Sequence, residues 1–163
     1  MAKGPVEIEF VENQAVTQRR GIAWLKIAAD SDVDAKVVFD GLETNDRTFV
    51  ADSMRAWIDG KPDIKTRFHG FPNDPDFRHG YVFKWRENRL QNRIYGFKIH
   101  PGIPDAKLEL CILALHATKN TDETDSWIKN KINGFRDDLN VRDAIKKQVR
   151  KLFDSNNKGQ LKQ

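Results

Sequence analysis

The chain has 163 residues, of which 39% are hydrophobic and 10% aromatic, which suffices for one packed domain and argues against two ordinary domains or global disorder. Its N-terminus lacks the apolar core of a secretory signal, and no window approaches the roughly 18 apolar residues of a membrane span. The composition therefore predicts a cytoplasmic protein without membrane contact. The one cysteine, Cys111, excludes an intramolecular disulfide and a zinc site built from cysteines.

The charge of the chain changes sign along its length. Residues 1–60 hold 7 Lys and Arg against 11 Asp and Glu, whereas residues 61–163 hold 21 against 13. The first part therefore carries −4 and the second +8. This asymmetry favours an anionic partner for the second part. The alternative is that the charges only keep the surface solvated.

The N-terminal part contains three short candidate elements. Apolar and acidic residues alternate over residues 6–11, which predicts a half-buried strand at an edge of a sheet. The pattern over residues 14–29 fits either a helix or a strand, and we favour the helix. A β-branched run at residues 36–39 predicts a second strand. We expect these segments, within residues 1–44, to be an elaboration of one domain.

The next helix has clearer signals. Residues 46–59 carry apolar side chains along one side, and Asn45 or Thr44 can cap the first turn. Trp57 on the apolar side is expected to be a core anchor. Residues 61–80 are rich in Pro, Gly, Asn, Asp and His, which predicts a long loop. Loops of this length are commonly functional or mobile.

The strongest β-signal and the densest positive charge coincide after this loop. Aromatic and cationic residues alternate over residues 81–87, which predicts a strand with one core face and one cationic, solvent-facing side. A polar turn at residues 89–92 and a strand at residues 93–99 complete a hairpin. Residues 108–117 are apolar on both faces, as expected of a central strand. The three strands should be consecutive antiparallel neighbours, with the helix at residues 46–59 packed on them.

Two further helices are predicted after the sheet. One runs from about residue 120 to 135, with one buried apolar side. The other begins at an Asn140 cap and carries Lys and Arg opposite its apolar stripe. Beyond Phe153 the chain is polar, so we expect the single domain to cover residues 1–153 and a disordered tail to cover residues 154–163.

The absence of several motifs reduces the number of enzymatic mechanisms that the sequence supports. The chain has no G-x-x-x-x-G-K-[ST], G-x-G-x-x-G, H-E-x-x-H or G-x-S-x-G sequence. Nucleotide hydrolysis and the common metallo- and serine-hydrolase mechanisms therefore lack support. We expect neither a metal nor a cofactor, because the histidines are too scattered for a metal site that is local in sequence; they are His69, His79, His100 and His116.

Three motifs follow one another in the second part of the chain: K-W-R at 84–86, R-I-Y at 93–95, and L-C-I-L-A-L-H-A-T-K-N-T-D-E-T-D at 110–125. Their order resembles the RelE and HigB-like toxins of bacterial type II toxin-antitoxin systems, over about residues 45–135. Those toxins are small basic α+β proteins whose curved antiparallel sheet binds messenger RNA, commonly in the ribosomal decoding site, and cuts it without a metal. The resemblance implies an α+β fold with a curved antiparallel sheet of about four to five strands and helices packed on one side. It also implies RNA or the ribosome and an antitoxin protein as partners.

The resemblance suggests roles for individual residues. Arg93 matches an arginine that contacts the scissile phosphate, His116 is the best candidate for proton transfer, and Lys119 agrees with a lysine of the family. The alternatives are a surface arginine and a histidine that is simply hydrogen-bonded at a strand end. Cations along the hairpin would bind phosphates or else be ordinary solvent-facing charges; they are Lys84, Arg86, Arg89 and Lys98.

The chain also departs from the family pattern. Asn120 stands where many relatives have a second basic residue, and the C-terminal tyrosine or histidine that serves several members as acid or base has no counterpart. Catalysis is therefore either lost or supplied by His100 or by the loop with His69 and His79. Two hypotheses follow. The chain is either a toxin-like, metal-independent endoribonuclease acting on mRNA in translation, or a non-catalytic, phage-derived protein whose sheet binds nucleic acid or a protein.

Overall fold

The computed structural model describes residues 4–12, 19–103, 107–119 and 123–161, which form six strands and four helices. In chain order these are β1 (Val6–Phe10), β2 (Arg20–Ile27), α1 (Ala35–Asp40), α2 (Thr44–Ile58), β3 (Phe68–Gly70), β4 (Gly80–Glu87), β5 (Leu90–Ile99), β6 (Glu109–Lys119), α3 (Ser126–Asp137) and α4 (Leu139–Leu161). The expected α+β class is confirmed. None of the described helices has the length and apolar character needed to cross a membrane.

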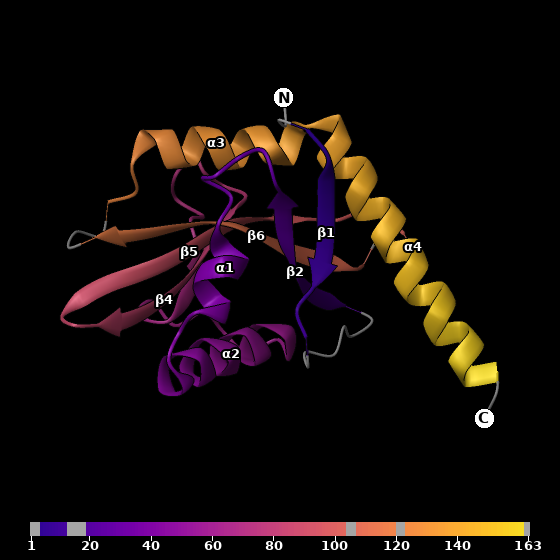
Figure 1. Cartoon of the computed structure of the whole chain (residues 1–163), viewed down its shortest axis with the longest axis horizontal. Coiled ribbons are helices and arrows are strands. Elements are labelled where there is room, and N and C mark those ends of the chain that lie inside the picture. Colours follow the sequence, from indigo (N-terminus) through magenta and orange to yellow (C-terminus); the bar gives the residue numbers. More distant parts are fainter. Residues whose placement is uncertain (1–3, 13–18, 104–106, 120–122, 162–163) are drawn as a thin grey trace.

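The strands form one mixed sheet in the order β1-β2-β6-β5-β4-β3 (Figure 1). All neighbours are antiparallel except β2 and β6, which are parallel. The expectation of a smaller, wholly antiparallel sheet is therefore wrong. A parallel pair needs a crossover connection, and here the chain passes through α1, α2 and the three strands β3 to β5 before β6 returns beside β2.

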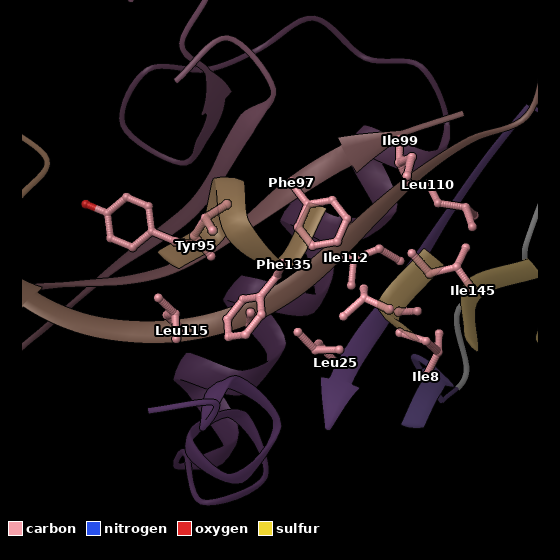
Figure 2. Packing of buried hydrophobic residues seen from close by; sticks show 14 of the residues in the cluster. Ile8, Leu25, Tyr95, Phe97, Ile99, Leu110, Ile112, Leu115, Phe135 and Ile145 are labelled. Carbon is pink, nitrogen blue, oxygen red and sulfur yellow. The ribbon is translucent and has the colours of Figure 1, made fainter. Parts of the chain in front are cut away.

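Helices cover both faces of this sheet (Figure 1). α1 and α2 pack on one face around Met54 and Trp57, and we call this the α2 face. α3 and α4 pack on the other, the α3 face, around Ile132 and Phe135. The resemblance implied helices on one side and left the side of the C-terminal helices open. α3 and α4 cover the second face, because each carries an apolar stripe that must be buried against a sheet. Figure 2 shows the α3-face core, where side chains of β5 and β6 meet those of the two helices, among them Phe97, Ile112, Phe135 and Ile145.

The predicted arrangement of β4, β5 and β6 is confirmed. They are consecutive antiparallel neighbours, and Val50, Met54 and Trp57 of α2 pack against them in one core. The turn is shorter than expected, because only Asn88 and Arg89 connect β4 to β5, with φ values of 53° and 67°. Two-residue turns with positive φ match the right-handed twist of the flanking strands. We call the part of β4 and β5 from residue 84 to 93 the hairpin end.

A β-bulge interrupts the pairing of β5 with β6. Tyr95 pairs with Leu115. The next residue, Gly96, pairs with Leu113, so Ala114 is an extra residue in β6. Because side chains alternate along a strand, one extra residue exchanges the faces of everything after it. Leu115 accordingly lies in the α3-face core together with Ala114, although the sequence placed these two side chains on opposite faces.

The ambiguous N-terminal segment is a strand, contrary to our preference for a helix. Residues 20–27 form β2, between β1 at the sheet edge and β6. Their apolar side chains are buried in both cores, Trp24 on the α2 face and Leu25 on the α3 face. A strand buried on both faces loses the alternating pattern that identifies strands. Residues 14–18 of the predicted helix lie outside the described residues.

The run at residues 36–39 belongs to a helix, α1, and not to a strand. Ala35, Val38 and Phe39 have helical spacing and pack in the α2-face core, whereas Val37 is 75% exposed. The β-preference of two adjacent valines is therefore overridden by the spacing of the residues that the sheet buries.

The C-terminal helices differ from the prediction mainly at their ends. α3 begins at Ser126, and residues 120–122 lie outside the described part. The Oδ1 atom of Asp138, and not the predicted cap Asn140, accepts the backbone N–H groups of Asn140 at 2.8 Å and Val141 at 3.2 Å. α4 continues to Leu161, beyond the expected end near Phe153.

Candidate functional site

The hairpin end brings three of the predicted RNA-contacting cations to one face. Lys84 of β4 pairs with Arg93 of β5. Arg86 pairs with Gln91. Paired residues share a face, and Tyr95, two positions beyond Arg93, lies in the α3-face core. Lys84, Arg86 and Arg93 therefore all belong to the α3 face.

Two of these three cations are buried. Lys84 is 5% exposed and Arg93 is 1% exposed. The Nζ atom of Lys84 donates to the carbonyl of Lys65 at 3.1 Å. Arg93 donates to Oε1 of Gln91 at 2.7 Å and to the hydroxyl of Tyr95 at 3.3 Å. The expectation of a wholly solvent-facing cationic row is wrong, because Lys84 and Arg93 are buried, Lys84 bonded to a loop carbonyl and Arg93 to two side chains of its own strand.

The exposed cations of the hairpin end are Arg86 and Arg89. Arg89 stands in the two-residue turn itself. Lys65, on the loop that binds Lys84, is a third exposed cation near this end. These side chains can reach a ligand without rearrangement of the sheet.

The other two predicted cations are placed differently. Lys98 lies near the far end of β5, with Nζ 5.4 Å from the ring centroid of Tyr81 on the α2 face. It does not join the hairpin end. Lys119 pairs with Gln91 at the end of β6, and its side chain lies outside the described part.

His116 lies on the opposite face of the sheet from Arg93. It shares Oδ1 of Asn92 with the hydroxyl of Thr118, each at 3.0 Å. Since an amide oxygen only accepts, Nε2 of His116 is the donor. The imidazole also stacks on Trp85 of the α2-face core, with centroids 5.9 Å apart. The structure therefore does not bring the predicted catalytic pair, Arg93 and His116, together.

The histidine that does share a face with Arg93 is His69. It pairs with Val82, a residue of the α3-face core. Its Nδ1 donates to the carbonyl of Gly70 at 2.7 Å, and its buried Nε2 has no hydrogen-bond partner among the described residues. Burial lowers the pKa of His69, and the positive charges of Lys84 and Arg93 lower this pKa further, against the opposing effects of the Gly70 carbonyl and the Asp63 carboxylate. His69 is thus a neutral base next to two cations.

A groove of about 660 Å³ runs beside the free edge of β4. β3 pairs only with residues 81–83 of β4, and one further backbone hydrogen bond follows, from the N–H of Lys84 to the carbonyl of Arg67 at 2.8 Å. The first turns of α2 contribute Asn45, Asp46 and Phe49 to the groove. Trp85 and Arg86 contribute from β4. The sequence did not reveal this groove, because it depends on how short β3 is.

Phe49 gives the groove an aromatic surface. It belongs to the apolar side of residues 46–59 that the sequence predicts to be buried, yet it is 38% exposed. The guanidinium carbon of Arg67 lies 4.2 Å from its ring centroid, and Nε of Arg67 donates to Oγ of Ser53 at 3.1 Å. A ring with a fixed cation beside it is a combination found in sites for single-stranded nucleic acids.

Acidification should destabilise the protein through His69 and His116. Burial lowers the pKa of both imidazoles in the folded state. The pKa of an unfolded histidine is about 6.5, so below that pH the unfolded chain binds protons that the folded chain does not, and stability is lost as pH falls. We expect the urea midpoint to drop between about pH 7.5 and 5.5, where ordinary carboxylates remain ionised. The double variant His69→Gln, His116→Gln should show a smaller drop, and a wild-type midpoint that rises on acidification would contradict this account.

Comparison with known protein families, with characterised proteins and with solved structures finds no match to this chain. The likeness to the RelE and HigB-like toxins therefore rests on the sequence motifs. Among the described residues, no three His, Cys, Asp or Glu side chains gather closely enough to hold a metal ion.

Proposed function

We propose that the chain binds RNA through the hairpin end and the groove beside it. The observation that carries this proposal is the position of exposed Arg86 next to the exposed ring of Phe49 in one groove, with Arg89 in the adjoining turn. Cations bind phosphates and aromatic rings stack on bases, both without regard to sequence. The excess positive charge of residues 61–163 adds long-range attraction for the same ligand.

The resemblance to the RelE and HigB-like toxins extends this proposal from RNA binding to action on messenger RNA. On that basis the RNA is messenger RNA in the context of translation, and an antitoxin protein is the partner that would neutralise the chain. The basis of this extension is the three sequence motifs at residues 84–86, 93–95 and 110–125.

The geometry supports RNA binding more strongly than RNA cleavage by the predicted residues. Cleavage without a metal needs a proton acceptor and a cation close to the same phosphate. The sheet separates Arg93 from His116, and Arg93 is 1% exposed. Binding requires only the exposed groups, such as Arg86.

Replacing Arg86 and Arg89 by glutamine should weaken RNA binding and its dependence on salt. For single strands each phosphate contact contributes about 0.7 to the slope of log affinity against log salt concentration, so the slope should fall by about 1.4. The measurement is fluorescence anisotropy of a labelled oligouridylate with the full chain at several salt concentrations. The control Arg150→Gln, Lys151→Gln removes two exposed charges from α4. It makes the same change in net charge and should change both quantities much less, because only long-range attraction is lost. Equal affinity and slope for wild type and the hairpin variant would sink the proposal.

A second candidate function is metal-independent RNA cleavage that uses His69 in place of His116. The observation that favours it is that His69, Lys84 and Arg93 share the α3 face and influence one another electrostatically. This scheme requires RNA binding to expose Nε2 of His69, which then takes up the proton of the attacking 2′-hydroxyl. The 2′-oxygen forms a bond to phosphorus, the bond from phosphorus to the 5′-oxygen breaks, and the leaving 5′-oxygen takes a proton from water. The cations stabilise the charge on the phosphorane.

Expression in bacterial cells distinguishes the two candidates. If His69 is the base, wild type arrests growth and produces new mRNA 5′ ends, and His69→Gln lowers cleavage by about 10² to 10⁴. His116→Gln, the matched control on the other face, should retain cleavage. Soluble wild type that binds RNA but yields no new ends would exclude cleavage and leave the binding function.

A further inference from the structure

A second cationic site lies at the other end of β5, where α3 meets α4. A pocket of about 200 Å³ is lined there by Arg136 of α3 and by Arg142 and Lys146 of α4, next to Ile99 and His100. No carboxylate is among the described residues that line it. Three cations thus surround a small concave space.

The two arginines are held in place by backbone carbonyls. Nε of Arg136 donates to the carbonyl of Lys98 at 3.1 Å, and Nε of Arg142 donates to the carbonyl of Arg136 at 2.8 Å. The terminal amino groups of Arg136 have no hydrogen-bond partner among the described residues. Those of Arg142 make one contact among these residues, at 3.7 Å to Asp137, whose side chain is 74% exposed. Groups positioned before a ligand arrives lose little conformational freedom on binding.

The charges within this pocket are poorly compensated. Burial lowers the pKa of Arg136, and the positive charge of Arg142 lowers this pKa further, although Asp137 opposes both. Glu109, a carboxylate at this end of the sheet, lies 3.3 Å from Nε2 of His100 and outside the pocket lining. An anion between the two guanidinium groups would relieve their mutual repulsion.

We propose that this pocket binds a phosphate group through Arg136, Arg142 and Lys146. Guanidinium groups suit phosphate because each can donate two parallel hydrogen bonds to its oxygens. The volume is below the roughly 300–1,000 Å³ of sites that enclose a drug-sized ligand. The pocket therefore holds a phosphate and its first linkage, and not a whole nucleotide.

The phosphate comes either from the solution, as the free ion, or from an RNA backbone. β5 has 10 residues, so the pocket lies about 30 Å from the hairpin turn. It is a separate site, and it does not depend on RNA binding at the hairpin end.

The test uses the full chain, inorganic phosphate and a matched pair of charge reversals. Phosphate is titrated at constant ionic strength against chloride, and the side-chain Nε–H signals of Arg136 and Arg142 are followed by NMR. Wild type should show a saturable shift of both signals. Lys146→Glu should weaken phosphate binding about tenfold or more, the loss expected for a charged hydrogen bond. Lys147→Glu makes the same change in net charge at an exposed position outside the pocket lining and should have little effect.

An oligouridylate titration shows whether the bound phosphate is the free ion or part of an RNA backbone. If Lys146→Glu weakens both phosphate and RNA binding, the pocket takes a backbone phosphate; if it weakens phosphate binding alone, the ligand is the free ion. Both results support the site. The Arg86→Gln, Arg89→Gln variant should bind phosphate as wild type does. The phosphate site can therefore be tested even if the proposal of RNA binding at the hairpin end is wrong. Absence of a saturable shift, or equal effects of Lys146→Glu and Lys147→Glu, would overturn the inference.

Discussion

Replacing Gly96 by alanine is expected to lower the free energy of unfolding by about 4 kcal/mol or more, at the upper end of single-residue effects. An added Cβ would lie 2.0 Å from the carbonyl oxygen of Ile112 and 2.9 Å from the Cα atom of Leu113. Both atoms belong to the backbone of β6 at the bulge, in the centre of the sheet, so neither can move aside without breaking strand pairing. Urea unfolding measures the loss.

Gly134→Ala is the matched control for that substitution. Gly134 lies in α3, and an added Cβ would meet nothing within 4 Å. Alanine should therefore stabilise the protein by up to about 1 kcal/mol through helix propensity. If Gly96→Ala were tolerated as well as Gly134→Ala, the close approach of β5 and β6 described above would be wrong.

Arg93→Ala is expected to cost about 3 kcal/mol of stability. The substitution removes a guanidinium that is 1% exposed, together with its hydrogen bonds to Gln91 and Tyr95. It leaves those two acceptors without this donor and a gap in the interior. Chemical denaturation of the purified variant measures the loss.

Arg86→Ala provides the comparison for Arg93→Ala, because Arg86 is exposed on the same face of the hairpin end. It should change stability by no more than about 0.5 kcal/mol while weakening RNA binding. The opposite result, in which Arg93→Ala keeps full stability and loses RNA affinity, would show that Arg93 is a surface contact, as the family resemblance implied.

The periodicity of apolar residues predicted correctly those strands and helices that have one apolar and one polar face. Tyr81, Phe83 and Trp85 alternate with polar or smaller residues in β4 and lie in one core, and the apolar side of α2 includes Trp57, which is buried as expected. Elements whose side chains are buried on both faces, such as β2, carry no such contrast. The alternation of side chains along β4 correctly placed Lys84 on the face opposite the aromatic residues. It did not show that neighbouring groups bury Lys84.

The candidate site depended on features that a single sequence does not display. His69 stands beside Lys84 only because a three-residue strand, β3, pairs with β4. His116 would share the face of Arg93 if β6 alternated regularly, and the extra residue Ala114 moves it to the other face. The position of a bulge depends on backbone packing between two strands, and here Gly96 is the residue that permits it.

The parallel pairing of β2 with β6 also governs the order in which the protein can assemble. Arg20 pairs with Glu109, so during synthesis β1 and β2 leave the ribosome long before the strand that completes their sheet. Until β6 is available, the edge of β2 stays unpaired and can associate with other chains. Pairing between segments so distant in sequence slows folding. The arrival of β6 is therefore the step that joins the two halves of the sheet, and we expect it to limit the folding rate.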